Sequence, residues 1–205
     1  MGKLFWEYKI APGVQEVIKR EKNIVMLGAP HESFMDGVHA AWMFLVMRVV
    51  KKSIRNTLDG KKVRIAMKKE MFPKFFKKVL EKVFLPVDRK TPKEFWEKIK
   101  NEEGDLIIGY APEGTRKKVD VWKSGGFRTA EWMNSPIVLG VLDYKTKIVE
   151  IVEAIETDDF LTDGKIDKEK MAEVANRIRA VYKNISEGSK GFDPNFKIKI
   201  RGQKY

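Results

Sequence analysis

Short apolar runs that each end in a polar turn most strongly limit how this chain can fold. Four of them, residues 23–29, 63–68, 85–87 and 105–111, have the length of strands, and segments with helical apolar spacing separate them. Strands that alternate with helices along a chain form a sheet covered by helices. The pattern therefore predicts a single-domain α/β sandwich on a mixed, largely parallel β-sheet flanked by helices.

The helices between these runs have recognisable starts. Asp36 is placed to cap a helix over about 37–54, and Pro92 stands at the first position of a helix that runs from Thr91 to about residue 100. Residues 72–84 also have helical apolar spacing.

The last third of the chain has a different pattern. Residues 136–144 and 147–155 predict a hairpin, and 196–201 alternate as a half-buried strand does. Asp167 is placed to cap a helix with the apolar stripe Met171, Val174, Ile178, Val181 and Ile185. No repeat or linker interrupts the chain, so residues 1–205 are predicted to form one domain, with 1–22 as an amphipathic N-terminal arm.

The chain is basic and lacks cysteine. Lys and Arg outnumber Asp and Glu by 41 to 29, a net charge of +12, which favours a phospholipid surface, a nucleic acid or a phosphorylated substrate. Without Cys there is no disulfide, thiolate nucleophile or Cys-based metal site, as suits a reducing cytoplasm. The longest apolar stretch, 38–50, falls short of the roughly 20 residues of a membrane span, and no secretory signal is apparent. We expect a cytoplasmic protein that meets a membrane, if at all, from its cytoplasmic face.

His31 and Asp36 stand in the loop that follows the predicted strand 23–29. A carboxylate that accepts a hydrogen bond from one imidazole nitrogen fixes the tautomer and leaves the other nitrogen free to take a proton. Such a base can deprotonate a hydroxyl and contributes about 10²–10⁴-fold to a rate. His-x4-Asp is a weak pattern by itself, but strand ends are where α/β sheets bind ligands. The pair is therefore predicted to be a general base with its orienting acid.

A second polar turn, Glu113-Gly114-Thr115-Arg116, follows the strand predicted at 105–111. Gly lets the backbone approach a ligand, Thr offers a hydroxyl, and Arg suits bidentate phosphate binding. Asp88-Arg89 is a third strand end that carries a cation. The alternative is an ordinary turn whose Glu and Arg pair with each other or with solvent.

Several other chemistries lose support. Ser33 has no Gly-x-Ser-x-Gly elbow around it, and no Gly-rich nucleotide motif occurs. The chain has only two His and no ligand cluster, so no metal site is expected. His39, on an apolar helix, is predicted to be a packed core residue.

Five short blocks together resemble the glycerophospholipid acyltransferase superfamily, particularly compact bacterial relatives of 1-acylglycerol-3-phosphate acyltransferase. They stand in the family's order over about the first two-thirds of the chain: His31-x4-Asp36, Lys68-x-Glu70, Pro86-Val87-Asp88-Arg89, Ala111-Pro112-Glu113-Gly114-Thr115-Arg116 and Pro136-Ile137-Val138.

The resemblance implies roles for these residues. His31 would be the general base on an acceptor hydroxyl that attacks an acyl thioester, and Asp36 would orient it. Pro136 would sit by the acyl-donor pocket. No metal or cofactor would be needed beyond acyl-CoA or acyl-carrier protein as co-substrate. The phosphate of the acceptor would be bound by Arg89, Glu113, Gly114, Thr115 and Arg116, with Lys68 as a further contributor.

The expected function is thus an O-acyltransferase that moves a fatty acyl group to a hydroxyl of a glycerophosphate-type lipid, with lysophosphatidate the favoured acceptor. One alternative is an acyltransferase for a different lyso-lipid. The other is a basic binding module, without enzyme activity, for a membrane or a nucleic acid. Because no nucleic-acid motif is recognised, a nucleic-acid partner is not expected.

Two segments are candidates for contact with an anionic membrane. Residues 71–84 interleave Phe with Lys as interfacial helices do, although a Phe stripe packed on the sheet explains the pattern equally well. Residues 4–18, with Phe5, Trp6 and Tyr8, are the second candidate.

Overall fold

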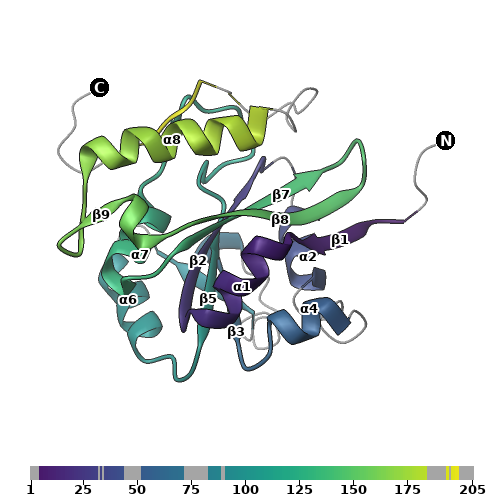
Figure 1. Ribbon diagram of the computed structural model, residues 1–205, viewed down its shortest axis with the longest axis horizontal. Coiled ribbons are helices and arrows are strands. Elements are labelled where there is room, and N and C mark those ends of the chain that lie inside the picture. Colours follow the sequence, from purple (N-terminus) through teal and green to yellow (C-terminus); the bar gives the residue numbers. More distant parts are fainter. Residues whose placement is uncertain are drawn as a thin grey trace.

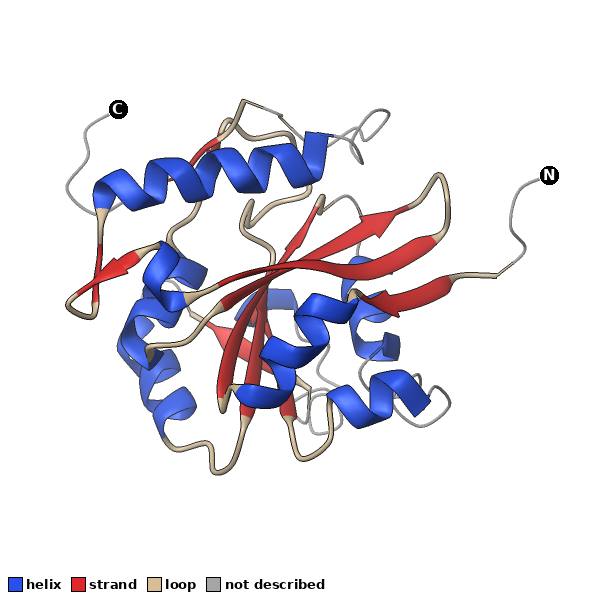
Figure 2. Cartoon of the chain, in the orientation of Figure 1, coloured by secondary structure: helices blue, strands red, loops and turns tan. Residues whose placement is uncertain are grey.

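Figures 1 and 2 show a central sheet with helices on both of its faces. This computed structural model describes residues 5–31, 33, 35–43, 52–71, 83–88, 91–183, 193 and 195–198. The sheet has seven strands, and all neighbouring pairs are parallel except β7 with β8. The predicted α/β sandwich on a mixed, largely parallel sheet is confirmed.

The strands lie in the order β1-β8-β7-β2-β5-β3-β4. β2 occupies the middle of the sheet, and its apolar run explains why: the side chains of both its faces are buried, as in a parallel strand covered by helices on each side. The strand bounds are β1 (Glu7–Ile10), β2 (Asn23–Ala29), β3 (Lys62–Lys68), β4 (Phe84–Val87), β5 (Leu106–Tyr110), β7 (Ile137–Asp143) and β8 (Ile148–Ile155).

Helices cover the two faces through separate apolar clusters. Val25 and Leu27 of β2 pack with α7 and α8, whereas Ile24 and Met26 pack with α1 and α4. The helix bounds are α1 (Pro12–Arg20), α2 (Met35–Trp42), α4 (Lys52–Thr57), α6 (Pro92–Lys100), α7 (Gly125–Met133) and α8 (Lys168–Lys183), with 3-10 turns η2 (Lys69–Met71) and η4 (Thr157–Asp159). Two short ladders complete the fold: β6 (Val121–Trp122) with β11 (Lys197–Ile198), and β9 (Leu161–Thr162) with β10 (Lys165–Ile166).

Five of the strands, β4, β3, β5, β2 and β7, run in the same direction. Their carboxyl ends therefore meet at one edge of the sheet, which we call the carboxyl edge. The loops after β2, β5 and β7 follow one another there because these strands are neighbours. The carboxyl edge is thus where residues distant in sequence come together.

The expected helix starts are partly confirmed. Asp167 accepts the backbone N–H of Glu169 and Lys170 and so caps α8, as predicted. Asp36 does not cap its helix, because α2 begins one residue earlier and Ser33 accepts the N–H of Met35. The long helix predicted over 37–54 is wrong in its bounds, since α2 ends at Trp42 and α4 begins at Lys52; residues 44–51 lie outside the described ranges.

The N-terminal segment, predicted as an amphipathic arm over residues 1–22, contributes a strand to the sheet from Glu7 onward. β1 pairs in parallel with β8, from Glu7 opposite Ile148 onward. Tyr8, Ile10 and Val14 are buried. Of the proposed docking segment 4–18, Val17 and Ile18 are buried in the core as well, whereas Phe5 is exposed. Of the other proposed docking segment, residues 72–82 lie outside the described residues.

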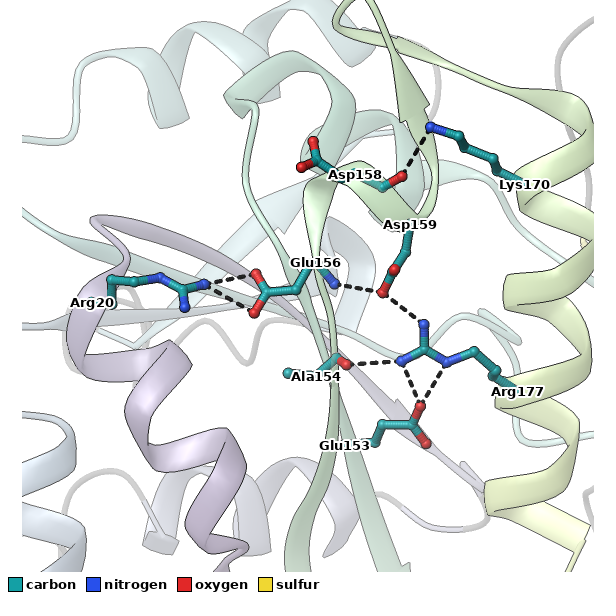
Figure 3. Close-up of polar contacts among 8 residues, drawn as sticks. All are labelled: Arg20, Glu153, Ala154, Glu156, Asp158, Asp159, Lys170 and Arg177. Atoms are coloured by element: carbon teal, nitrogen blue, oxygen red, sulfur yellow. Dashed lines mark hydrogen bonds and ion pairs between the residues drawn. The ribbon is translucent and has the colours of Figure 1, made fainter.

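Ion pairs join four elements, α1, α8, β8 and η4, at the edge of the sheet opposite the carboxyl edge (Figure 3). Arg177 of α8 donates to Glu153 of β8 and to Asp159 of η4, at 3.0 and 2.6 Å. Arg20 at the end of α1 donates to both carboxylate oxygens of Glu156. These contacts tie helices from both faces to the end of β8, which is a structural role remote from the carboxyl edge.

Candidate active site

His31 and Asp36 form a hydrogen-bonded pair at the carboxyl edge. His31 follows β2, and its Nδ1 lies 2.7 Å from Oδ2 of Asp36 in the first turn of α2. Because a carboxylate only accepts, Nδ1 carries the proton and Nε2 is the nitrogen that can take one. The side chain of His31 is 23 % exposed, so the ring is accessible rather than sealed in the interior. The predicted pairing of the two residues is confirmed.

Asp36 is held in its charged form by three donors. Its Oδ2 accepts His31 Nδ1 and the backbone N–H of Ser33, and its Oδ1 accepts the hydroxyl of Tyr144. Burial favours the neutral acid and raises the pKa of Asp36, but the hydrogen bonds from His31, Tyr144 and Ser33 outweigh it. The net effect is a pKa below its usual value of 3.8, so the carboxylate stays ionised next to the imidazole.

Glu113 supports the same histidine from the neighbouring strand. It follows β5, its side chain is 2 % exposed, and its Oε2 accepts the backbone N–H of His31 at 2.7 Å. Glu113, predicted to belong to the phosphate-binding set, thus fixes the main chain of the base, and it is not among the residues that line the cavity beside His31.

The turn that contains Glu113 is shaped around a lysine. Gly114 has φ +62°, and a Cβ on it would lie 2.4 Å from Nζ of Lys123. The backbone N–H of Lys123 in turn donates to the carbonyl of Pro112 at 2.8 Å. Glycine is thus needed at this position both for its left-handed backbone and for the lysine that lies against it.

The pair His31–Asp36 opens onto a cavity of about 1190 Å³, which exceeds the usual range for small-molecule sites of about 300–1000 Å³. Its floor includes Gly28, Gly109 and Gly140, on three neighbouring strands. Gly28 and Gly140 pair directly in register, so the middle of the sheet lacks side chains there. The apolar walls are formed by Met26, Met43, Ile65, Met67, Phe84, Val141 and Leu142, among others.

The mouth of the cavity is cationic. Lys68 at the end of β3 and Arg116 after β5 both line it and are exposed, and Gly114 and Thr115 line it beside them. Two further positive charges come from Lys123, just before α7, and from Arg128 on α7. Arg89 falls outside the described residues, so the structure does not place it.

Pro136 does not join this group. It precedes β7, and its carbonyl accepts the N–H of Val25 near the start of β2. That is the amino end of both strands, about 20 Å from the carboxyl edge for a strand of seven residues. Pro136, expected beside the acyl-donor pocket, is therefore not among the residues that line this cavity.

His39 is buried, as predicted from its apolar helix. Its Nδ1 lies 3.0 Å from the hydroxyl of Tyr8, and the ring of Trp6 lies 3.9 Å from its own. Burial lowers the pKa of His39 more than the charge of Asp36 raises it. The second histidine is therefore a neutral packing residue rather than a second base.

Sequence reasoning missed Tyr144, Lys123 and Arg128. For Tyr144 a signal existed: it is the last residue of the strand predicted over 136–144, and strand ends are where α/β sheets bind ligands. Lys123 and Arg128 gave no such signal, because no strand long enough to recognise precedes them.

Comparisons with protein-family models, with curated proteins and with solved structures give no match for this chain. Among the described residues, no group of three or more His, Asp or Glu is arranged to hold a metal ion. No helix in the described ranges combines the length and the apolar character that a membrane span requires.

Proposed function

We propose that this protein is an O-acyltransferase, which moves a fatty acyl group from a thioester donor, acyl-CoA or acyl-carrier protein, to a hydroxyl of a glycerophosphate-type lipid such as lysophosphatidate. The observation that carries this proposal is the 2.7 Å hydrogen bond between His31 and Asp36 at the cationic mouth of a large apolar cavity. Charged and apolar parts of one site match a substrate that has both.

In the proposed reaction, Nε2 of His31 takes the proton of the acceptor hydroxyl as its oxygen attacks the thioester carbonyl carbon. The C–S bond then breaks, the ester forms, and the departing sulfur receives the proton from the imidazolium. Asp36 holds the ring in the required tautomer and stabilises its positive charge. The overall exchange is alcohol plus thioester to ester plus thiol, and it needs no covalent intermediate on the protein.

The two halves of the cavity support the two parts of the substrates. The glycine floor and the Met, Ile, Phe and Leu walls provide an apolar space in which an acyl chain can be buried away from water against apolar side chains. Lys68, Arg116 and Lys123 at the mouth suit a phosphate, and Arg can bind it through two parallel hydrogen bonds. Binding of a nucleic acid would not require an apolar cavity of this size.

The decisive assay is release of free thiol from acyl-CoA in the presence of candidate acceptors. We expect turnover with lysophosphatidate, and a loss of about 10²–10⁴-fold in His31→Ala. Asp36→Asn is expected to lose activity while keeping substrate affinity, because the carboxylate touches the base and not the substrate. Undiminished activity in His31→Ala would refute the assignment of the base.

Acceptor specificity is tested with a matched pair of variants. Arg116 lines the cavity, whereas its neighbour Lys117 is exposed but does not line it. Arg116→Ala should raise KM for a phosphate-bearing acceptor, and Lys117→Ala should leave it unchanged. If phosphate-free acceptors outperform lysophosphatidate, the acceptor is another lyso-lipid. Salt-sensitive DNA binding without thioester cleavage would contradict the enzyme altogether.

The same proposal includes contact with an anionic membrane surface at the cytoplasmic face, since a lyso-lipid acceptor partitions into bilayers and the chain carries a net charge of +12.

A further inference from the structure

Helix α2 has its polar and apolar faces reversed. Asp36 and His39 point inward and are buried, and Met43 continues that face just beyond the helix end. On the outer face, Met35, Val38 and Trp42 are 46, 38 and 47 % exposed. A helix on the surface of a water-soluble protein normally exposes its polar side chains and buries its apolar ones. The outer face of α2 is therefore expected to be covered by something apolar.

Aromatic side chains and lysines adjoin this face. Tyr144, in the turn between β7 and β8, is exposed and donates its hydroxyl to Asp36 on α2, so the turn and the helix are in contact. The ring of Trp6 lies 5.2 Å from that of Tyr144, and its neighbour Phe5 is 77 % exposed. Figure 1 shows α2, the β7–β8 turn and the start of β1 on the same side of the molecule.

We infer that Met35, Val38, Trp42, Tyr144 and Phe5 form a surface, the α2 face, that docks on an anionic lipid bilayer. Trp and Tyr are the residues that prefer the boundary between water and hydrocarbon. Lys145 follows Tyr144 directly and is exposed, and Lys147 is two residues further. The α2 face thus combines apolar, aromatic and cationic groups as interfacial surfaces do.

The position of the α2 face favours a bilayer over another partner. Val38 belongs both to this face and to the lining of the cavity, so the cavity begins where the docked surface would be. A lyso-lipid that leaves the bilayer at this point reaches His31 without crossing open water. In this respect the inference rests on the proposed function, but docking itself can be measured without turnover.

The chain offers a matched control. Trp132 on α7 is 48 % exposed, almost the same as Trp42, and its helix packs on the opposite face of the sheet. It shares only residue type and exposure with Trp42. We therefore compare the double variant Met35→Ser/Trp42→Ser with Trp132→Ser, and neither variant alters a residue that lines the cavity.

The experiment is sedimentation with vesicles of phosphatidylcholine that contain phosphatidylglycerol, without acyl donor. We expect the double variant to partition at least about tenfold more weakly than the wild type, and Trp132→Ser to partition equally. Lys145→Glu should weaken binding about fivefold and make it less sensitive to salt. Equal partitioning of the double variant and the wild type would overturn the docking surface.

Brominated lipids give a second readout that does not depend on removing apolar contacts. The emission of each Trp is the difference between the wild type and its Phe variant. Brominated lipids should quench the emission of Trp42, measured with Trp42→Phe, and should leave that of Trp132, measured with Trp132→Phe, unchanged. If both Trp residues are spared while the wild type forms a dimer that Met35→Ser/Trp42→Ser disrupts, the α2 face binds a second copy and the inference is wrong.

Turnover separates this inference from the proposed function. Thiol release with a short-chain, water-soluble lysophosphatidate needs no bilayer, and the double variant should keep it. Vesicle binding through the α2 face without any thiol release would sink the proposed function and leave the docking surface standing. Thiol release without vesicle binding would refute the docking surface and leave the proposed function standing.

Discussion

The Tyr144→Phe substitution tests how the candidate base is positioned. The change removes one hydroxyl and keeps the ring, so the edge-on contact with Trp6 is retained. In the described part of the chain, Tyr144 is the donor to Oδ1 of Asp36, whereas His31 and Ser33 share Oδ2. Its loss frees the carboxylate to rotate and takes away one of the groups that lower the pKa of Asp36.

The magnitude follows from the geometry. A hydrogen bond to a charged group is worth about 1.5–3 kcal/mol. Because Tyr144 is 36 % exposed, water can partly replace its hydroxyl, which favours the lower end of that range. We expect a loss of about 1.5 kcal/mol in the free energy of unfolding and a fall in kcat/KM of roughly tenfold.

Two measurements check this expectation, urea unfolding at neutral pH and thiol release from acyl-CoA. Lys145→Ala, next in the same turn, is the control and should leave both unchanged when the acceptor is a short-chain, water-soluble lysophosphatidate that needs no bilayer. The double variant Tyr144→Phe/Asp36→Asn should be no worse than Asp36→Asn alone, because the tyrosine acts through the carboxylate. Wild-type values in Tyr144→Phe, or strictly additive losses in the double variant, would refute the reasoning.

Three further predictions concern stability. Gly114→Ala should lower the free energy of unfolding by about 1–2 kcal/mol because of its positive φ, and it should raise KM for phosphate-bearing acceptors because the new Cβ displaces Lys123. Gly60→Ala is the control: with φ +72° and nothing within 4 Å, it should show only the loss of stability in urea unfolding. Gly126→Ala places a methyl group 2.5 Å from a leucine methyl carbon of β2 and should lower the thermal midpoint by an amount that corresponds to about 1–3 kcal/mol. The pKa of His39 is lower in the folded chain than the usual 6.5, so the unfolded chain binds its proton more tightly and stability should fall as the pH drops below 6.5; unfolding curves of His39→Gln should lack this slope, and an unchanged slope would contradict the assignment.

The sheet and half of the site could be predicted because they depend on local pattern. A strand covered on both faces, such as β2, must be apolar at every position, and the residue after its end must then lie at the sheet edge. That reasoning located His31 and Arg116, whereas Lys68 was named through the family resemblance alone. Asp36 was paired with His31 correctly, but it does not cap the helix, because α2 begins before it and Ser33 accepts the N–H of Met35.

The remaining features depend on which strands are neighbours, which no local pattern contains. Tyr144 reaches Asp36 only because β7 lies beside β2, and Glu113 reaches the main chain of His31 only because β5 lies on the other side. The place of Pro136 was not predictable for the same reason: a short block in the sequence does not tell at which end of a strand it stands. The N-terminal segment looked like an arm because its partner strand is so distant in sequence.

The large sequence separation between β1 and β8 affects the order in which the sheet folds. β1 precedes β8 in the chain, and because the partner of Glu7 is Ile148, the strand cannot join the sheet until β8 has been synthesised. Contacts between such remote segments form late, since a long loop must close first. Trp6 precedes that strand directly and packs against Tyr144, which donates to Asp36, so the support of the His31–Asp36 pair is completed only when β1 joins the sheet.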